Sequence, residues 1–181
     1  MKMIVILCIS ILLAGCNRLF PDEELMLQKA DYKGNELKIN GYFYHFQQQP
    51  SGTIVKYLYR NGIILSGYYH STTDLNEVEI EMVKEYDLLQ KDKSRWGVFV
   101  INGNSIQYSA WSTSVGGGLP SFKCLGVIEN DTTFRITKSI NSNGKEFSEN
   151  KIYHFRQFSP KPDSTNVYIK YSFNKIIHEK N

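Results

Sequence analysis

Residues 53–71 read TIVKYLYRNGIILSGYYHS, and this stretch indicates the fold class of the chain. Two runs rich in Ile, Val, Leu and Tyr, residues 53–60 and 63–71, flank the dipeptide Asn61-Gly62. Asn and Gly adopt positive φ angles at low cost, as both central residues of a type I′ turn must. The stretch therefore predicts a tight β-hairpin.

Segments of the same composition continue along the chain, separated by turn residues. The turns are predicted at Asn102-Gly103-Asn104, Asn130-Asp131 and Asn143-Gly144. The further strands are predicted over residues 37–47, 96–101, 105–114, 121–129, 132–140, 147–158 and 167–174. Because tight turns make neighbours in sequence neighbours in space, we expect an antiparallel meander of about eight or nine strands.

Residues 74–91 interrupt this pattern with the spacing of an amphipathic helix. Apolar residues recur at intervals of three and four, with acidic residues on the opposite side. The apolar set is Leu75, Val78, Met82, Tyr86 and Leu89, and the acidic set includes Glu77, Glu81 and Glu85. Thr73 or Asp74 can cap the first turn. We expect the apolar face to pack on the sheet or across a barrel end.

A meander of this length tends to curl, and closure removes the exposed strand edges that invite aggregation. We therefore predict a barrel or a strongly curled sheet, with a two-sheet β-sandwich as the alternative. The sequence contains no repeat or linker. Residues 37–181 are accordingly expected to form a single β-rich domain.

The N-terminus has the pattern of a secretion signal. Lys2 precedes an apolar run over residues 3–13, which is too short to span a membrane. The run ends at Leu13-Ala14-Gly15-Cys16, which resembles the lipobox of bacterial lipoproteins. The alternatives are an ordinary signal peptide with a chance cysteine, or a short buried helix.

The lipobox resemblance implies a specific maturation. Residues 1–15 would be a signal peptide, cleaved between Gly15 and Cys16, and Cys16 would carry an S-diacylglycerol and an N-acyl group such as palmitate. Two or three acyl chains are enough for stable anchoring in a membrane. Inner-membrane lipoproteins of enteric bacteria usually have Asp at the next position, so Asn17 favours the outer membrane of the cell envelope.

The residues after the cysteine are expected to form a tether. We assign residues 16–36 to the lipidated cysteine and this tether, with one helical turn over residues 23–29. The acidic cluster Pro21-Asp22-Glu23-Glu24 is similar to the export signals of surface lipoproteins in Bacteroidota. A solvated tether is the favoured interpretation of the cluster.

The mature chain also resembles a family. Gly41-Tyr42-Phe43 in the first strand and the runs over residues 57–62 and 126–134 are similar to the lipocalin-like lipoproteins of Bacteroidota. Phe43 stands where lipocalins carry Trp, and the helix lies between the third and fourth strands instead of after the last. The resemblance implies a β-barrel with a place for a small ligand.

Cysteine usage is simple once the leader is set aside. Cys8 leaves with the signal and Cys16 is acylated, so Cys124 is the one thiol of the mature chain and no intramolecular disulfide is possible. Cys124 alternates with Phe122 and Ile128, which are apolar. We interpret Cys124 as a core residue; the alternative is a reactive thiol.

Other chemistry-bearing residues show no known motif. The net charge of +3 is spread along the chain, which argues against a nucleic-acid partner. Gly116-Gly117-Gly118 lacks the Lys-Ser/Thr and the helix of a phosphate loop and predicts a mobile loop. The four histidines are far apart and lack metal-ligand spacing: His45, His70, His154 and His178. We therefore predict neither a cofactor nor a metal site, and no enzyme.

The strands are rich in aromatic residues: Tyr42, Tyr44, Tyr57, Tyr59, Tyr68, Tyr69, Tyr108 and Trp111. These can line a cavity for a small apolar ligand, stack on sugars from the outer face, or serve as half-buried strand residues. The leading hypothesis is an envelope lipoprotein that binds a small ligand, or an envelope protein or glycan. The alternatives are a structural lipoprotein with a filled barrel, and an enzyme whose site is assembled from distant strands.

Overall fold

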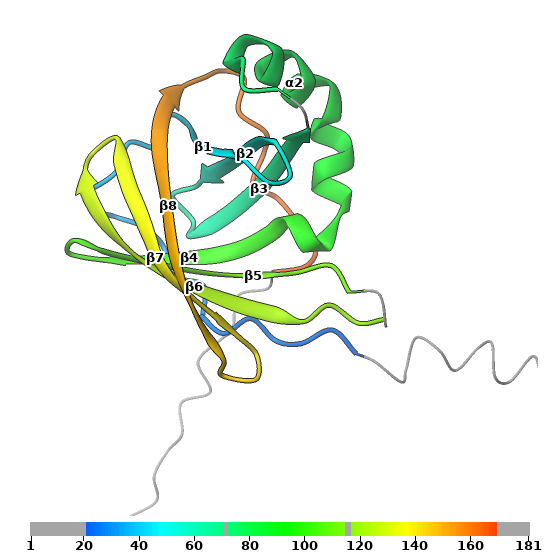
Figure 1. Ribbon diagram of the computed structural model, residues 1–181, viewed down its shortest axis with the longest axis vertical. Coiled ribbons are helices and arrows are strands. Elements are labelled where there is room, and N and C mark those ends of the chain that lie inside the picture. Colours follow the sequence, from blue (N-terminus) through cyan, green and yellow to red (C-terminus); the bar gives the residue numbers. More distant parts are fainter. Residues whose placement is uncertain (1–20, 71, 115–116, 170–181) are drawn as a thin grey trace, which may run out of the picture.

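The computed structural model of the protein describes residues 21–70, 72–114 and 117–169 and shows a closed antiparallel barrel of eight strands (Figure 1). Each strand pairs with the next one in sequence, and β8 pairs with β1. The barrel prediction is therefore confirmed over the sandwich. The strands are β1 (Gly41–Gln47), β2 (Gly52–Leu58), β3 (Ile63–His70), β4 (Trp96–Asn102), β5 (Ser105–Trp111), β6 (Ser121–Asn130), β7 (Thr133–Asn141) and β8 (Glu146–Gln157).

The seam between β1 and β8 depends on a glycine. Gly41 lies opposite Gln157, and a Cβ atom on Gly41 would lie 2.0 Å from the carbonyl oxygen of Arg156. A side chain at this position would push the two strands apart. Glycine allows the close backbone approach that closes the barrel.

The hairpin over residues 53–71 forms as predicted, but its turn is of another type. The N–H of Tyr59 donates to the carbonyl of Ile63, and the N–H of Gly62 donates to the carbonyl of Tyr59, each at 3.0 Å. This is a three-residue loop with Gly62 at φ 74°, not the predicted type I′ turn. The carbonyl of Gly62 accepts from the N–H of Phe99 at 2.9 Å, which joins the turn to β4.

Alternation along the strands separates an inner from an outer set of side chains. Within the barrel, the rings of Phe134 and Tyr153 stack with centroids 4.9 Å apart. The inner set forms one core cluster that includes Phe43, Leu58, Ile64, Phe99, Ile106, Tyr108, Cys124, Phe134, Ile136 and Tyr153. Cys124 is buried in this cluster, as its alternation predicts.

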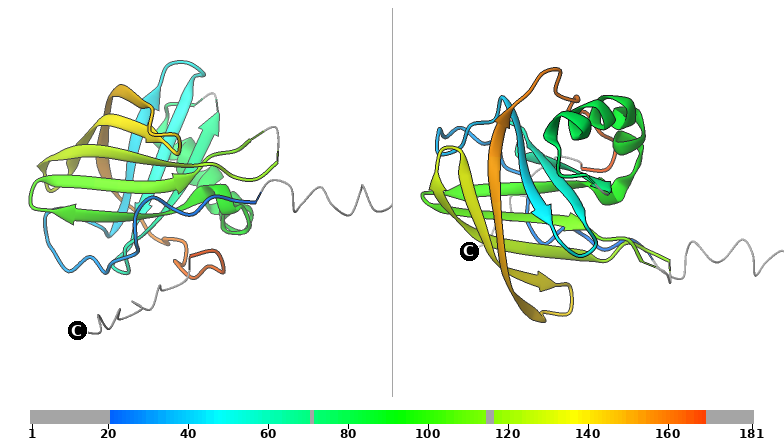
Figure 2. Two further views of the ribbon diagram at one scale, coloured as in Figure 1. Left: turned by 90° about the horizontal axis from the view of Figure 1, so that it is seen from below. Right: turned by 45° about the horizontal axis from the view of Figure 1, so that its top comes forward.

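The predicted helix is confirmed as α2 (Leu75–Lys91), followed by the short 3₁₀ helix η1 (Lys93–Arg95). Asp74 caps α2, because its carboxylate accepts from the N–H of Asn76 at 2.8 Å. The helix lies on the outside of the barrel wall, not across its end (Figure 2). It buries a second cluster that contains Tyr42, Val55, Tyr57, Leu65, Tyr69, Val78, Met82, Leu89 and Trp96.

Residues 21–37, which we call the strap, run along the outside of the barrel instead of forming a free tether (Figure 2, blue). The strap bonds to the barrel at several points, among them the N–H of Tyr32 to the carbonyl of Arg60 at 2.8 Å. Tyr32 and Leu37 are buried and close one end of the barrel. The tether prediction is therefore wrong from residue 21 onward, and residues 23–29 form no helical turn.

The prediction of a ninth strand over residues 167–174 is wrong for those of its residues that the structure describes. Residues 167 and 168 form a bend, residue 169 has no regular structure, and residues 170–174 lie outside the described residues. Because β8 already pairs with β1, the barrel offers that segment no open edge. Instead, the chain after β8 packs against α2, where the hydroxyl of Tyr168 donates to the carbonyl of Lys91 at 2.6 Å.

Candidate ligand cavity

A cavity of about 370 Å³ opens at the end of the barrel opposite Tyr32 and Leu37. Residues of β2, β5, β6, β7 and β8, most of them inward-facing, line it, and the β5–β6 and β7–β8 connections lie at its mouth. The barrel interior is therefore packed at the end that the strap closes and hollow at the other. Its apolar walls come from Ile54, Phe122, Ile140 and Phe147.

Lys56 of β2 also lines the cavity, and it is buried. Its Nζ donates to Ser66 Oγ at 3.2 Å and lies 4.4 Å from the ring centroid of Tyr108 and 5.6 Å from that of Tyr153. Removal from water disfavours the charged ammonium, so burial lowers the pKa of Lys56 to about 8.

The other titratable groups beside Lys56 are held in their neutral forms. Burial raises the pKa of the Cys124 thiol, and this effect outweighs the hydrogen bond with Tyr108 and the charge of Lys56, which lower it. Burial likewise raises the pKa of the Tyr108 and Tyr153 hydroxyls. A thiolate at Cys124 is therefore disfavoured, which fits a core cysteine better than a reactive one.

The rim of the cavity carries both signs of charge. Glu149 accepts from Ser139 Oγ at 2.9 Å and forms an ion pair with Lys151 Nζ at 2.9 Å. Burial alone would raise the pKa of Glu149, but the hydrogen bonds from Lys151 and Ser139 lower it overall. Glu149 is thus ionised and already paired on its own strand.

The described histidines lie elsewhere. His45 faces inward and its Nδ1 lies 3.0 Å from the carbonyl oxygen of Ile152. His154 pairs with the neighbouring residue Tyr44, so alternation places it on the opposite face from His45. His70 ends β3, and His178 lies outside the described residues. Residues 21–70, 72–114 and 117–169 hold no group of three or more His, Cys, Asp or Glu that could bind a metal ion.

Of the aromatic residues singled out from the sequence, Tyr108 lines the cavity. Five are buried on the outside of the wall, namely Tyr42, Tyr57, Tyr59, Tyr69 and Trp111. Tyr44 and Tyr68 are half-buried. The sequence did not lead to a prediction for Lys56. Its alternation with Ile54 and Leu58 on one face of β2 was the signal that could have identified it as a cavity residue.

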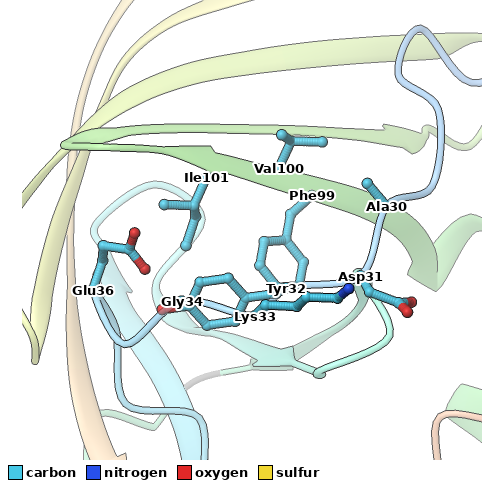
Figure 3. A pocket seen from close by; sticks show the side chains of 9 residues that line it. All are labelled: Ala30, Asp31, Tyr32, Lys33, Gly34, Glu36, Phe99, Val100 and Ile101. Atoms are coloured by element: carbon cyan, nitrogen blue, oxygen red, sulfur yellow. The ribbon is translucent and has the colours of Figure 1, made fainter.

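A second pocket, of about 90 Å³, lies between the strap and β4 (Figure 3). Figure 3 shows the ring of Tyr32 facing Phe99, with centroids 5.7 Å apart. The hydroxyl of Tyr32 accepts from the N–H of Leu37 at 2.9 Å. The space is far below the roughly 300 Å³ of a small-molecule site, and its residues serve to close the barrel end.

Two further segments bear on function. Gly117 and Gly118 have positive φ angles and lie in the β5–β6 connection at the mouth, whereas Gly116 lies outside the described residues. Gly15 and Cys16, the predicted processing and acylation site, also lie outside them. Within the part of the chain that is described, no helix is long and apolar enough to cross a membrane.

No protein-family model matches the chain, and neither a curated protein nor a solved structure was found to match it. The likeness to lipocalin-like lipoproteins stays a prediction. The chemistry of the cavity is therefore argued from its own residues.

Proposed function

We propose that the protein is a membrane-anchored lipoprotein of the cell envelope that binds a small ligand in the open end of its barrel. The cavity carries the proposal, because about 370 Å³ with apolar walls is enough for a small molecule. A structural lipoprotein with a filled barrel would have no need of this hollow end.

The strap relates the proposed anchor to the cavity. At the mouth, Trp111 Nε1 donates to the carbonyl of Glu23 at 2.7 Å, and the N–H of Leu119 donates to Asp22 Oδ1 at 2.8 Å. The six peptide steps from Cys16 to Asp22 can span at most about 20 Å. An acyl group on Cys16 would therefore hold the mouth of the cavity close to the bilayer, with the outer membrane as the favoured one.

The anchor is tested by labelling cells with radioactive palmitate. We expect label on the wild-type protein, none on Cys16→Ser, and a mature N-terminus at Cys16. Label on the Cys16→Ser protein, or a different mature N-terminus, would contradict the anchor.

Ligand binding is tested by native mass spectrometry of protein purified from its own host. We expect a co-purifying mass that is lost in Cys124→Phe, which fills the cavity, and kept in Val127→Phe. Val127 is an exposed position on the same strand, so it controls for the added ring. A mass kept in both variants would place the ligand outside the barrel, and no co-purifying mass in any sample would count against the small-ligand function.

A further inference from the structure

A lysine inside the barrel is the feature that the proposed function leaves unexplained. Ile54, Lys56 and Leu58 share the inner face of β2, and Lys56 is 6% exposed. Lysine is almost never fully buried unless its charge is paired. An apolar residue at this position, opposite Phe43 on β1 and Ser66 on β3, would avoid that cost.

The ammonium of Lys56 is poorly satisfied. It has three N–H donors, and within the described part of the chain its one hydrogen bond goes to Ser66 Oγ. The faces of the Tyr108 and Tyr153 rings offer further, weaker stabilisation. Among the described residues, no carboxylate forms an ion pair with Lys56.

The groups that face Lys56 leave the site electropositive. Cys124 on β6, Tyr108 on β5 and Tyr153 on β8 are neutral near pH 7, since burial raises the pKa of each. Lys151 on β8 also lowers the pKa of Lys56, after burial, but its own charge is balanced by Glu149, with which it forms an ion pair in the cavity lining. Lys56 therefore carries the unbalanced positive charge of the lining.

We infer that the ligand of the cavity is a small amphiphile with one negative charge, whose anionic group binds Lys56 Nζ. This rests on the proposed binding function and names its ligand class. The anion would accept the remaining N–H donors of the ammonium, and the apolar part would lie against Phe122 and Phe147 nearer the mouth. An aliphatic carboxylate and an aromatic sulfonate share this chemistry.

Two dyes with one skeleton separate the charge from the cavity. 8-Anilinonaphthalene-1-sulfonate is an anion, and N-phenyl-1-naphthylamine is the neutral molecule without the sulfonate. The fluorescence of both dyes increases when they move from water into an apolar site. They are titrated into the mature chain, residues 16–181 with Cys16→Ser, so that neither acyl groups nor detergent take up the dyes.

We expect Lys56→Met to weaken binding of the sulfonate roughly ten- to a hundredfold, because a charge-assisted hydrogen bond is lost. The affinity for the neutral dye should be unchanged or higher. Lys151→Met, a rim variant with the same loss of charge, should weaken the sulfonate less than about threefold, as expected for a partly exposed charge. In the wild type, sulfonate binding should weaken between pH 7 and pH 10 as Lys56 loses its proton, and neutral-dye binding should not.

The outcomes separate the two proposals. If both dyes bind and the sulfonate is insensitive to Lys56→Met, the anion site is wrong while the binding function stands. If neither dye binds, both proposals fail. A final comparison uses decanoate and decan-1-ol as competitors for the neutral dye: decanoate should displace it at lower concentration in the wild type, and the difference should vanish in Lys56→Met.

Discussion

Arg156 of β8 and Glu79 of α2 form a two-point ion pair, with Nε 2.7 Å from Oε1 and Nη2 3.2 Å from Oε2. The hydroxyl of Tyr42 donates to the same Glu79 Oε1 at 3.0 Å, and Arg156 Nη2 also donates to Asn76 Oδ1 at 3.0 Å. These bonds hold the first half of α2 over the seam at which β1 and β8 close the barrel. The helix is thus fixed by charge as well as by its apolar face.

A double-mutant cycle measures this pair. We expect Glu79→Gln and Arg156→Met to show a coupling free energy of about 1 kcal/mol in urea unfolding, because the geometry is two-point and the carboxylate is mostly buried. The exposed pair Lys138–Glu146 serves as the control and should couple by less than about 0.5 kcal/mol. Equal coupling free energies in the two cycles would mean that the ion pair at the seam stabilises the protein no more than an exposed pair does.

Two buried tyrosines on the outer wall differ in the hydrogen bonding of their hydroxyl groups. The Tyr42 hydroxyl bonds to Glu79, whereas the Tyr69 hydroxyl is buried without a hydrogen-bond partner among the described residues. We expect Tyr42→Phe to lower the free energy of unfolding by about 1–2 kcal/mol and Tyr69→Phe to leave it unchanged or raise it. Thermal unfolding of both variants checks this, and a loss of stability in Tyr69→Phe would reveal an ordered water at that hydroxyl.

The barrel and its helix could be predicted because each rests on local chemistry. Turn residues such as Asn102-Gly103 specify hairpins, and the spacing of Val78, Met82 and Leu89 specifies a helix that must cover something apolar. The turn at Gly62 departed from prediction because its carbonyl bonds to Phe99 on another strand. Local preference alone could not include that contact.

The two ends of the chain were predicted less well, because tertiary packing decides them. The strap has the polar composition of a tether, yet Tyr32 and Leu37 find an open barrel end to fill. Residues 167–174 alternate like a strand, yet no edge is left for them to join. At the cavity, the alternation that predicts an inward Cys124 also predicts an inward Lys56, but the charge of a lysine argues against a position in the core.

Glu23 fixes the strap at the cavity mouth, and its contribution should depend on pH. Its carboxylate accepts from the N–H of Ser121 at 2.7 Å, and this hydrogen bond is the largest of the effects that lower the pKa of Glu23. A lowered folded-state pKa stabilises the protein above the unfolded value, about 4.3, and that stabilisation is lost as the pH falls through the folded value. We expect Glu23→Gln to lower the melting temperature at pH 7, and we expect this difference from the wild type to shrink as the pH falls below about 4. A difference in melting temperature that stays constant as the pH falls would contradict a role for the charge.

Gly41 is expected to be essential for closing the barrel. In Gly41→Ala the new methyl would meet the Arg156 carbonyl at the seam, so we expect a loss of more than about 2 kcal/mol in the free energy of unfolding. Gly103→Ala is the control, because that position has φ +55° but open space around it, and it should cost only about 1 kcal/mol. Urea unfolding that ranks Gly103→Ala as the more damaging change would contradict the seam argument.

The buried Lys56 should cost the empty protein stability, in a way that pH reveals. Its pKa is about 8 in the folded protein against about 10.4 in an unfolded chain, so the folded state binds fewer protons between these values. Burial of Lys56 therefore lowers the free energy of unfolding of the wild type below pH 8, by roughly 3 kcal/mol at most, and this loss disappears as the pH rises toward 10.4.

We expect Lys56→Met to be more stable than the wild type at pH 7 and to lose that advantage near pH 10, as measured by urea unfolding without ligand. Because every other titrating group is common to the two proteins, the difference between their pH profiles isolates Lys56. An equal or lower stability of Lys56→Met at pH 7 would mean that Ser66 and the two tyrosine rings already compensate the buried charge, which would leave an anionic ligand nothing to neutralise.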